Sequence, residues 1–225
     1  MASTESLSEA YFREIYAASD DPWHFDTSAY EAEKYRATIA MLGRSSYRRA
    51  LEIGCSIGVL TDDLATCCER LVAVDIDERP LARARRRCVS RTNVSFARMT
   101  IPHDVPPGVF DLVVISEVGY YWSDLDLARV RDLIVTYGAG TTIELVHYLP
   151  RVDAYLRDGD AVHESFLGDV RFEGLRAKRT KLYRIDVLDV RPLSSPHVSG
   201  ETHTRASARP PRPPSLAACH VGPQT

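Results

Sequence analysis

The stretch Leu51-Glu-Ile-Gly-Cys-Ser-Ile-Gly58, followed by Val72-Ala-Val-Asp-Ile76, decides the fold of this chain. The pattern predicts a buried strand, a turn that pivots on glycine, the start of a helix, and a second strand that ends in a carboxylate. Glycine lets the backbone lie close to a ligand, and free amides at a helix start can donate to it. Asp75, roughly 20 residues after the turn, is placed to accept both hydroxyls of a ribose. The arrangement indicates a site for a nucleoside-bearing cofactor.

The details of the turn distinguish two kinds of cofactor. A dinucleotide site requires G-x-G-x-x-G, but Ser56 stands where the second glycine belongs. The spacing E-x-G-x-x-x-G, which runs from Glu52 to Gly58, is similar to the loop of S-adenosylmethionine-dependent methyltransferases. An ordinary strand-turn-helix without a ligand accounts for the glycines, but not for Glu52 together with Asp75. We therefore expect S-adenosylmethionine as the cofactor.

The rest of the chain alternates between strands and helices, which predicts an α/β fold with a doubly wound, mostly parallel seven-stranded sheet. Continuous apolar runs such as Leu112-Val-Val-Ile115 are typical of parallel strands covered on both faces. The alternation in Tyr183-Arg-Ile-Asp-Val187 favours a less buried strand near the sheet edge. The expected strands are 49–53, 70–75, 94–98, 110–115, 140–147, 169–175 and 182–189. The expected helices after the first strand are 58–67, 79–88, 124–137 and 160–167.

Two further helices, 7–18 and 29–42, are expected before the sheet. Ser6-Leu-Ser-Glu9 and Ser28-Ala-Tyr-Glu31 both fit the S-x-x-E capping box that opens a helix. Pro22 interrupts the helical pattern between them and predicts a loop with exposed aromatic side chains. We expect residues 1–48 to form a helical lid over a methyltransferase domain at 49–190.

The last segment, 191–225, differs in composition from the rest. Arg209-Pro-Pro-Arg-Pro-Pro214 favours polyproline II and cannot bury a core. A disordered tail is therefore expected, with a docking motif for a proline-recognising module as an alternative.

Composition limits the function further. The net charge of −3, with both signs mixed along the chain, argues against nucleic acid as the main partner. Five cysteines without C-x-x-C spacing predict neither disulfides nor a zinc site, so no metal is expected. The N-terminus is polar, and no apolar run is long enough to span a membrane. We expect a soluble, cytoplasmic protein with a small-molecule substrate, whose oligomeric state is open.

Cofactor contacts are expected outside the carboxyl ends of the strands, where open α/β sheets bind ligands. Met99 is placed to pack on the adenine ring, or to fill an ordinary loop. Tyr30 and Lys34 lie four residues apart on one helix face and can point at one site; Lys34 either contacts the cofactor carboxylate or is solvated. The expected cofactor residues are Trp23, Tyr30, Lys34, Glu52, Gly54, Cys55, Ser56, Gly58, Asp75, Ile76, Met99, Thr100 and Ser116.

The segment Ser116-Glu-Val-Gly-Tyr-Tyr-Trp122 gathers a carboxylate and three aromatic rings at one strand end. Such groups attract a sulfonium and a cationic amine. Glu117 can hold a substrate amine or take its proton. His147, which closes the fifth strand, can accept a proton near neutrality or serve a structural role. Tyr120 is either a wall of the site or part of the core. We expect these three residues to be catalytic.

Several segments in order resemble one family, the rhizobial nodulation methyltransferases (NodS). They are Asp21-Pro-Trp23, Tyr30-Glu31, Lys34, Gly54-Cys-Ser-Ile-Gly-Val-Leu-Thr61, Ala73-Val-Asp75 and Ser116-Glu-Val-Gly-Tyr-Tyr121. The resemblance implies a Rossmann-like class I methyltransferase fold. It also implies N-methylation of the free amine on the non-reducing glucosamine of a chitooligosaccharide, during Nod factor biosynthesis. Another small-molecule amine or hydroxyl acceptor is the alternative. A non-catalytic adaptor is a third reading, against which the intact acidic residues argue.

Overall fold

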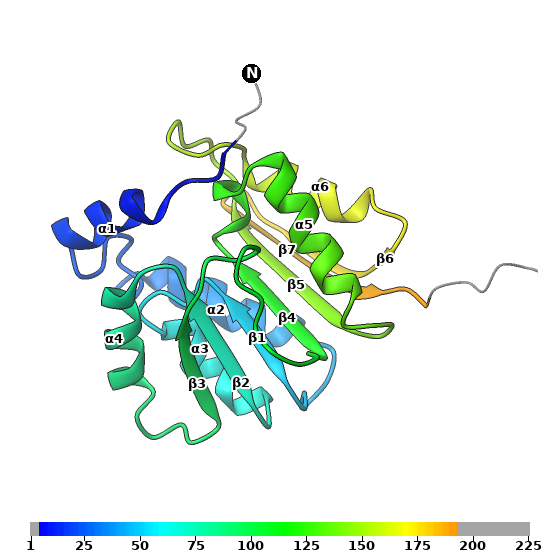
Figure 1. Ribbon diagram of the computed structural model, residues 1–225, viewed down its shortest axis with the longest axis horizontal. Helices are drawn as coiled ribbons and strands as arrows, with labels where there is room; N and C mark the ends of the chain where they lie inside the picture. Colours follow the sequence, from blue (N-terminus) through cyan, green and yellow to red (C-terminus); the bar gives the residue numbers. More distant parts are fainter. Residues whose placement is uncertain (1–4, 193–225) are drawn as a thin grey trace, which may run out of the picture. The chain divides into compact units, whose positions relative to one another are not determined.

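The computed structural model describes residues 5–192, which contain a seven-stranded sheet in the order β3-β2-β1-β4-β5-β7-β6 (Figure 1). The five strands from β3 to β5 run parallel, and β7 is antiparallel to both of its neighbours. The predicted doubly wound, mostly parallel sheet is confirmed. The strands are β1 Ala50–Ile53, β2 Leu71–Asp75, β3 Val94–Arg98, β4 Leu112–Ser116, β5 Thr142–Tyr148, β6 Phe172–Arg179 and β7 Tyr183–Val190.

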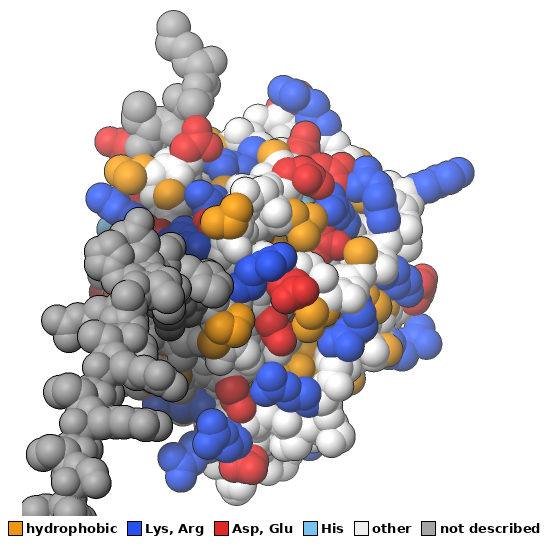
Figure 2. Space-filling view, turned by 90° about the vertical axis from the view of Figure 1, so that its right-hand side faces the viewer, with side chains coloured by type: hydrophobic (Ala, Val, Ile, Leu, Met, Phe, Trp, Pro, Cys, Tyr) orange, Lys and Arg blue, Asp and Glu red, His pale blue; other side chains and the backbone are white. Residues whose placement is uncertain are grey.

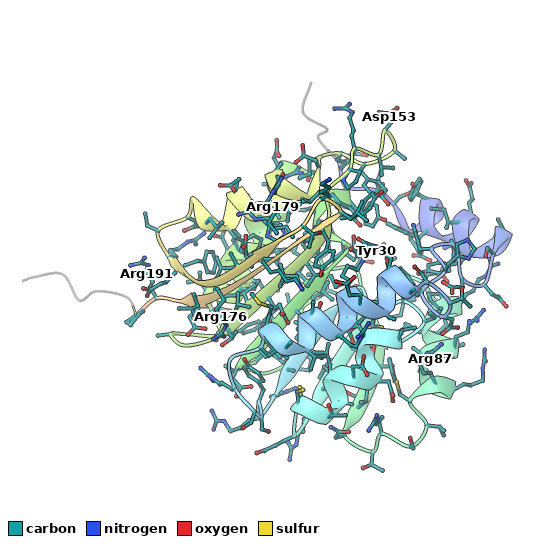
Figure 3. The ribbon with its side chains drawn as sticks, turned by 180° about the vertical axis from the view of Figure 1, so that it is seen from behind. Tyr30, Arg87, Asp153, Arg176, Arg179 and Arg191 are labelled. Atoms are coloured by element: carbon teal, nitrogen blue, oxygen red, sulfur yellow. The ribbon has the colours of Figure 1, made fainter. Side chains whose placement is uncertain are left out.

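Helices cover both faces of this sheet. Helices α5 and α6 lie on the face nearer the viewer in Figure 1, and α2 and α3 lie on the other face, which Figure 3 shows. Helix α4 packs against β2 and β3, and α1 contacts α4. The helices are α1 Glu9–Ala18, α2 Ala29–Met41, α3 Val59–Leu64, α4 Glu78–Arg87, α5 Asp124–Val135 and α6 Gly159–Leu167, with 3₁₀ turns η1 Ala65–Cys67 and η2 Gly119–Tyr121.

The order of the strands sets the place of the ligand. Strand β1 lies between β2 and β4, so the chain leaves β1 toward one side of the sheet and later continues on the other. The carboxyl edge beside this reversal is where open α/β sheets form a crevice. All five residues of β4 are buried, because helices cover both sides of the strand.

The helix starts agree with the sequence at α2 but not at α1. The hydroxyl of Ser28 accepts from the N–H of Glu31, as the predicted capping box requires. The prediction that Ser6 opens α1 is wrong, because Ser8 is the N-cap. The Ser6 hydroxyl instead donates to Asp126, at 2.5 Å, and so ties the segment before α1 to α5. A tertiary contact has therefore replaced a local cap.

The last two strands differ from their predicted places. Strand β6 begins at Phe172 and not at 169, because the N–H of Phe172 closes a turn onto the carbonyl of Asp169. Strand β7 lies next to the edge strand β6, so its predicted place near the sheet edge is confirmed, but it is mostly buried, whereas the middle of β6 is exposed. Figure 2 shows acidic and basic side chains interspersed on the face that carries this edge.

The loop between α1 and α2 was predicted to expose its aromatic side chains, and this is wrong. Trp23 and Phe25 are half-buried. Their rings stack with centroids 5.5 Å apart, and the rings of Trp23 and Tyr16 form a T-shaped pair with centroids 5.5 Å apart. The loop therefore adds an aromatic layer to the fold.

The described residues 5–192 all belong to one compact unit, which includes both the N-terminal helices and the sheet. The predicted proline-rich tail lies outside the described residues from position 193 onward. Within residues 5–192, no helix is both long and apolar enough to cross a membrane.

Two glycines offer a matched test of packing behind the β1 turn. Gly58 has φ +79°, and a Cβ there would lie 2.8 Å from the Cβ of Ala84, whereas Gly138 has φ +99° with nothing within 4 Å. Both Gly→Ala variants should lose about 1 kcal/mol to backbone strain, and Gly58→Ala a further ~1–3 kcal/mol to overpacking. Urea unfolding measures both losses. Equal losses would contradict the packing role of Gly58.

Candidate active site

A cavity of about 780 Å³ opens at the carboxyl ends of β1, β2 and β4, between the sheet and the N-terminal helices. It brings together every residue predicted for the site except Gly58 and His147. The predicted residues that line it are Trp23, Tyr30, Lys34, Glu52, Gly54, Cys55, Ser56, Asp75, Ile76, Met99, Thr100, Ser116, Glu117 and Tyr120. Residues far apart in the sequence therefore share one space.

The turn after β1 forms one wall of this cavity. Gly54 has φ +83°, and a Cβ on it would lie 2.1 Å from Cγ1 of Val118. The N–H of Gly54 donates to the carbonyl of Val74 at 2.8 Å, and the N–H of Ser56 donates to Oδ2 of Asp75 at 2.9 Å. Only glycine fits position 54, because the backbone is left-handed and the loop after β4 approaches it closely.

Asp75 closes β2 beside this turn. Its Oδ2 accepts from Ser56 and its Oδ1 accepts from the N–H of Asp77 at 3.1 Å. Burial raises the pKa of Asp75 to about 6, although both backbone donors oppose the shift. Each carboxylate oxygen has a second lone pair, so the group can still accept hydrogen bonds from a ligand in the cavity.

Glu52, two residues before the turn, is the second acidic group of this wall. It is only 1% exposed, and burial raises its pKa to about 8. Among the described residues, its Oε2 has no hydrogen-bond partner. A buried polar atom without a partner is rare and costly, so a ligand that donates a hydrogen bond here would satisfy it.

Gly58 does not line the cavity, although its neighbours Ile57 and Val59 do, so its predicted contact with the cofactor stays a prediction. It stands directly before α3 and approaches Ala84 of α4 closely. The left-handed backbone at Gly58 sets the direction of α3. Its role is therefore to shape the loop from behind.

Glu117 lines the cavity from the loop directly after β4, next to the turn that contains Gly54. Its backbone has φ +59°, which is uncommon for a residue other than glycine. Three donors hold its carboxylate: Nζ of Lys34, the hydroxyl of Tyr120, and the N–H of Tyr148 at 3.1 Å. The charge of Glu117 is thus fixed in one place and faces the cavity.

Lys34 joins Glu117 to a second carboxylate. Its Nζ lies 2.9 Å from Oε2 of Glu31, and the side chain is only 1% exposed. Burial lowers the pKa of Lys34, but Glu117 and Glu31 outweigh burial and hold it above its usual value. Lys34 is therefore not solvated. The predicted partner of Lys34 was the carboxylate of the cofactor. In the structure its partners are two carboxylates of this chain, Glu31 and Glu117.

Aromatic rings surround this charged group. Nζ of Lys34 lies 5.0 Å from the ring centroid of Tyr30 and 5.9 Å from that of Tyr35. Figure 3 shows Tyr30 at the start of α2, and its ring meets those of Tyr148 and Tyr183 edge-on. Cations gain from aromatic faces when water is excluded, so the rings stabilise the charge on Lys34.

Sequence reasoning missed several residues that line the cavity. Glu31 had an available signal, because it lies one helical turn before Lys34 and the two side chains must be neighbours. Tyr148 follows His147 at the end of β5, so its place at the strand end was also readable. No local pattern indicated Tyr16 of α1 or Tyr155 of the loop before α6.

The prediction that His147 takes a proton from a substrate does not fit its position. The side chain is fully buried and does not line the cavity. Its Nε2 accepts from the N–H of Gly119 at 3.0 Å, and its Nδ1 lies 3.2 Å from Nε2 of His163. Burial, with a contribution from His163, keeps the pKa of His147 well below its usual value.

The profile of the Nodulation protein S (NodS) family matches residues 8–140, more than half of the chain. The chain belongs to the NodS family. Nodulation protein S of Bradyrhizobium diazoefficiens is 38% identical over 120 residues, which are 52% of this chain and 57% of that protein. Its counterpart in Sinorhizobium fredii is 33% identical over 120 residues, 52% and 56% of the two chains. The aligned part thus spans little more than half of these curated relatives.

Solved structures agree with the fold of this NodS-family chain. N-methyltransferase NodS from Bradyrhizobium japonicum WM9, in complex with S-adenosyl-L-homocysteine, superposes with a TM-score of 0.69 at 23% identity, over 81% of this chain and 97% of that one. A protein of Pseudomonas syringae assigned as a methyltransferase gives 0.62 at 30% identity, over 72% and 99%. The class I methyltransferase fold is therefore confirmed.

Glu52 predicts a pH dependence of stability in the NodS-family chain. Its pKa in the folded state lies above the usual value of a glutamic acid, so the folded state binds the proton more tightly. The free energy of unfolding should fall as the pH rises from about 5 to 8, on the order of 1.4 kcal/mol for each unit by which the pKa is raised. Asp75 contributes only to the lower part of this window, since its pKa is about 6.

The variant Glu52→Gln should therefore flatten the fall between pH 6 and 8, measured by urea unfolding of the ligand-free protein. Glu173→Gln, an exposed position on β6, is the control and should keep the wild-type slope. The assignment to Glu52 fails if both variants behave alike.

Proposed function

We propose that this NodS-family chain transfers the methyl group of S-adenosylmethionine to an amine nitrogen. We further propose that the acceptor is the free amine of the non-reducing glucosamine of a chitooligosaccharide, used in Nod factor biosynthesis. The observation that carries the proposal is the sharing of one cavity by the Gly54 turn and the carboxylate pair Glu31 and Glu117. Family membership and the NodS fold support the same activity.

The wall around the β1 turn fits S-adenosylmethionine. Gly54 lets the backbone approach the ligand without a Cβ, and Asp75 can accept from the ribose hydroxyls. The unpartnered Oε2 of Glu52 fits a donor such as an α-ammonium group. Met99 and Ile76 supply apolar contacts for an adenine ring. When bound, this cofactor supplies a methyl group already activated on a sulfonium.

The part of the cavity around Glu31 and Glu117 fits an amine. Glu31 and Glu117 carry two negative charges against one positive charge on Lys34, so the group is attractive to a cationic amine before reaction. Glu117 is held by its three donors and can orient the nitrogen through its remaining lone pairs. The tyrosine rings offer apolar faces to the C–H faces of a sugar; those of Tyr120 and Tyr155 stack with centroids 4.3 Å apart.

The nitrogen must lose a proton for transfer to occur. Glu31 is suited to receive it, because burial raises the pKa of its carboxyl group and the side chain lines the cavity. Positioning then supplies much of the rate, since the cavity holds the two reactants in one orientation. Tyr120 acts here by fixing Glu117 through its hydroxyl.

A second acceptor class, another small amine or a hydroxyl compound, places similar demands on these side chains.

We also propose that the reaction takes place in the cytoplasm, a proposal supported by the four free cysteines of the described residues.

Glu117 should be needed for turnover and not for cofactor binding. Glu117→Ala leaves Lys34 with one carboxylate partner and removes the anchor for the amine, so kcat should fall by roughly 10² or more. The affinity for S-adenosylhomocysteine, measured by calorimetry, should change by less than about threefold. The control Asp153→Asn lies on an exposed loop, labelled in Figure 3, and should leave both quantities unchanged. Wild-type turnover in Glu117→Ala would remove its proposed role.

Acceptor profiling tests the substrate class. Radiolabelled S-adenosylmethionine should label chitooligosaccharides whose non-reducing residue carries a free amine. Fully N-acetylated oligosaccharides of equal length are the matched control and should stay unlabelled, because an amide nitrogen is a poor nucleophile. Labelling of simple amines alone, without the oligosaccharide, would favour the second acceptor class.

A further inference from the structure

A line of buried polar side chains runs from the outer strands to the loop that carries Glu117. Its members are His147 of β5, His163 of α6 and Asp186 of β7. The two histidines are fully buried, and Asp186 is 2% exposed. None of the three lines the cavity. Three polar groups so deep in a core need mutual hydrogen bonds.

The direction of every hydrogen bond in this line follows from one backbone amide. The N–H of Gly119 can only donate, so Nε2 of His147 is an acceptor without a proton. Neutral His147 therefore carries its proton on Nδ1. This N–H donates a hydrogen bond to Nε2 of His163, 3.2 Å away. His163 in turn carries its proton on Nδ1 and donates to Oδ2 of Asp186 at 2.8 Å.

The far end of the line is held as firmly. Nε of Arg184 lies 2.8 Å from the same Oδ2 of Asp186, and its guanidinium also pairs with Asp160 and Glu164 of α6. The Oδ2 of Asp186 thus faces both Nδ1 of His163 and the guanidinium of Arg184. The charged groups that face the two imidazoles are Asp186 and Arg184 from β7, Asp160 from α6, and Lys34 from α2.

At its near end the line meets a turn with no spare room. A Cβ on Gly119 would lie 2.8 Å from Nε2 of His147 and 2.5 Å from Cγ1 of Val162. The turn is therefore pressed against both α6 and the imidazole. Its neighbours Glu117 and Tyr120 are bonded to each other in the cavity, and Glu117 has a left-handed backbone. A strained backbone of this kind persists only where contacts with the surrounding structure hold it in place.

We propose that His147 and His163 are positioning residues that anchor the Gly119 amide and thereby hold Glu117 and Tyr120 in their places in the cavity. This inference rests on the proposed function for its effect on turnover, but its geometry can be tested separately. The histidines touch no substrate and move no proton. They fix where the carboxylate stands.

The tautomers provide the first test. In full-length protein labelled with ¹⁵N-histidine, long-range ¹H–¹⁵N spectra at a pH of about 6.5, where a free histidine is half charged, should show both imidazoles neutral and protonated on Nδ1. Burial lowers the pKa of both groups, which agrees with neutral rings. Assignment comes from the spectra of His147→Gln and His163→Gln. A proton on Nε2 of either residue, or a charged ring, would overturn the proposed line of hydrogen bonds from Gly119 to Asp186.

Kinetics provide the second test. His147→Leu keeps the bulk and leaves the Gly119 amide without an acceptor, so kcat should fall roughly tenfold or more, toward the hundredfold that a shift of about 1 Å costs. The affinity for S-adenosylhomocysteine should stay within about twofold, since the β1 turn is untouched. His147→Gln restores an acceptor and should recover most of the loss. Ile134→Ala, buried in α5 away from the cavity, controls for destabilisation and should leave kcat unchanged.

The two proposals fail in different ways. If wild-type protein methylates no acceptor, the proposed function fails. The tautomers, and the change in the amide chemical shift of Gly119 in His147→Leu, still show whether the histidines anchor the Gly119 amide. If wild-type protein is active and His147→Leu turns over equally fast, the positioning role is wrong. A kcat loss in His147→Leu that Ile134→Ala shares would also overturn it, because general destabilisation would then explain the effect.

Discussion

The ion pair between Lys34 and the two carboxylates Glu31 and Glu117 is the interaction on which the site depends. An ammonium that is 1% exposed requires both partners, because removing one partner of a buried pair costs about 3–5 kcal/mol. Glu31 and Lys34 belong to α2, whereas Glu117 follows β4. The N-terminal helix and the sheet edge are therefore joined by charge, and the acceptor wall forms only when both are in place.

The backbone at both walls of the cavity is left-handed. Gly54 and Ser56 have positive φ on the cofactor side, and Glu117 has positive φ on the acceptor side. Hydrogen bonds offset each strained residue: Ser56 donates to Asp75, and Glu117 accepts from three groups. Because a Cβ at position 54 would strike Val118, the two strained turns also lie against each other. A substitution that shifts the backbone of one turn should therefore also shift the backbone of the other.

The parts of this site that could be predicted have local signals. The spacing of the glycines predicts the turn after β1, and the preceding apolar run predicts that the Glu117 segment follows a buried strand. The errors came from contacts that span the sequence. Ser6 caps no helix because Asp126, 120 positions later, binds its hydroxyl. The alternation that suggested a less buried strand at 182–189 hides the buried Asp186, whose carboxylate faces His163, 23 positions earlier on α6. Neither partner can be read from the residues nearby.

His147 shows why the strand end alone does not define a role. Glu117 and His147 stand at the carboxyl ends of adjacent strands, but one faces the cavity and the other faces His163 on α6. The family profile covers residues 8–140 and so includes both cofactor turn and Glu117, whereas His147, His163 and Asp186 all lie beyond it. The glycine turn after β1 and Glu117 thus fall within the matched segment, whereas the buried side chains behind the Gly119 turn fall outside it, as do Tyr148 and Tyr155 of the cavity wall. Changes in β5 or α6 can therefore reach the Gly119 turn directly, because His147 accepts from its N–H and Val162 packs against it.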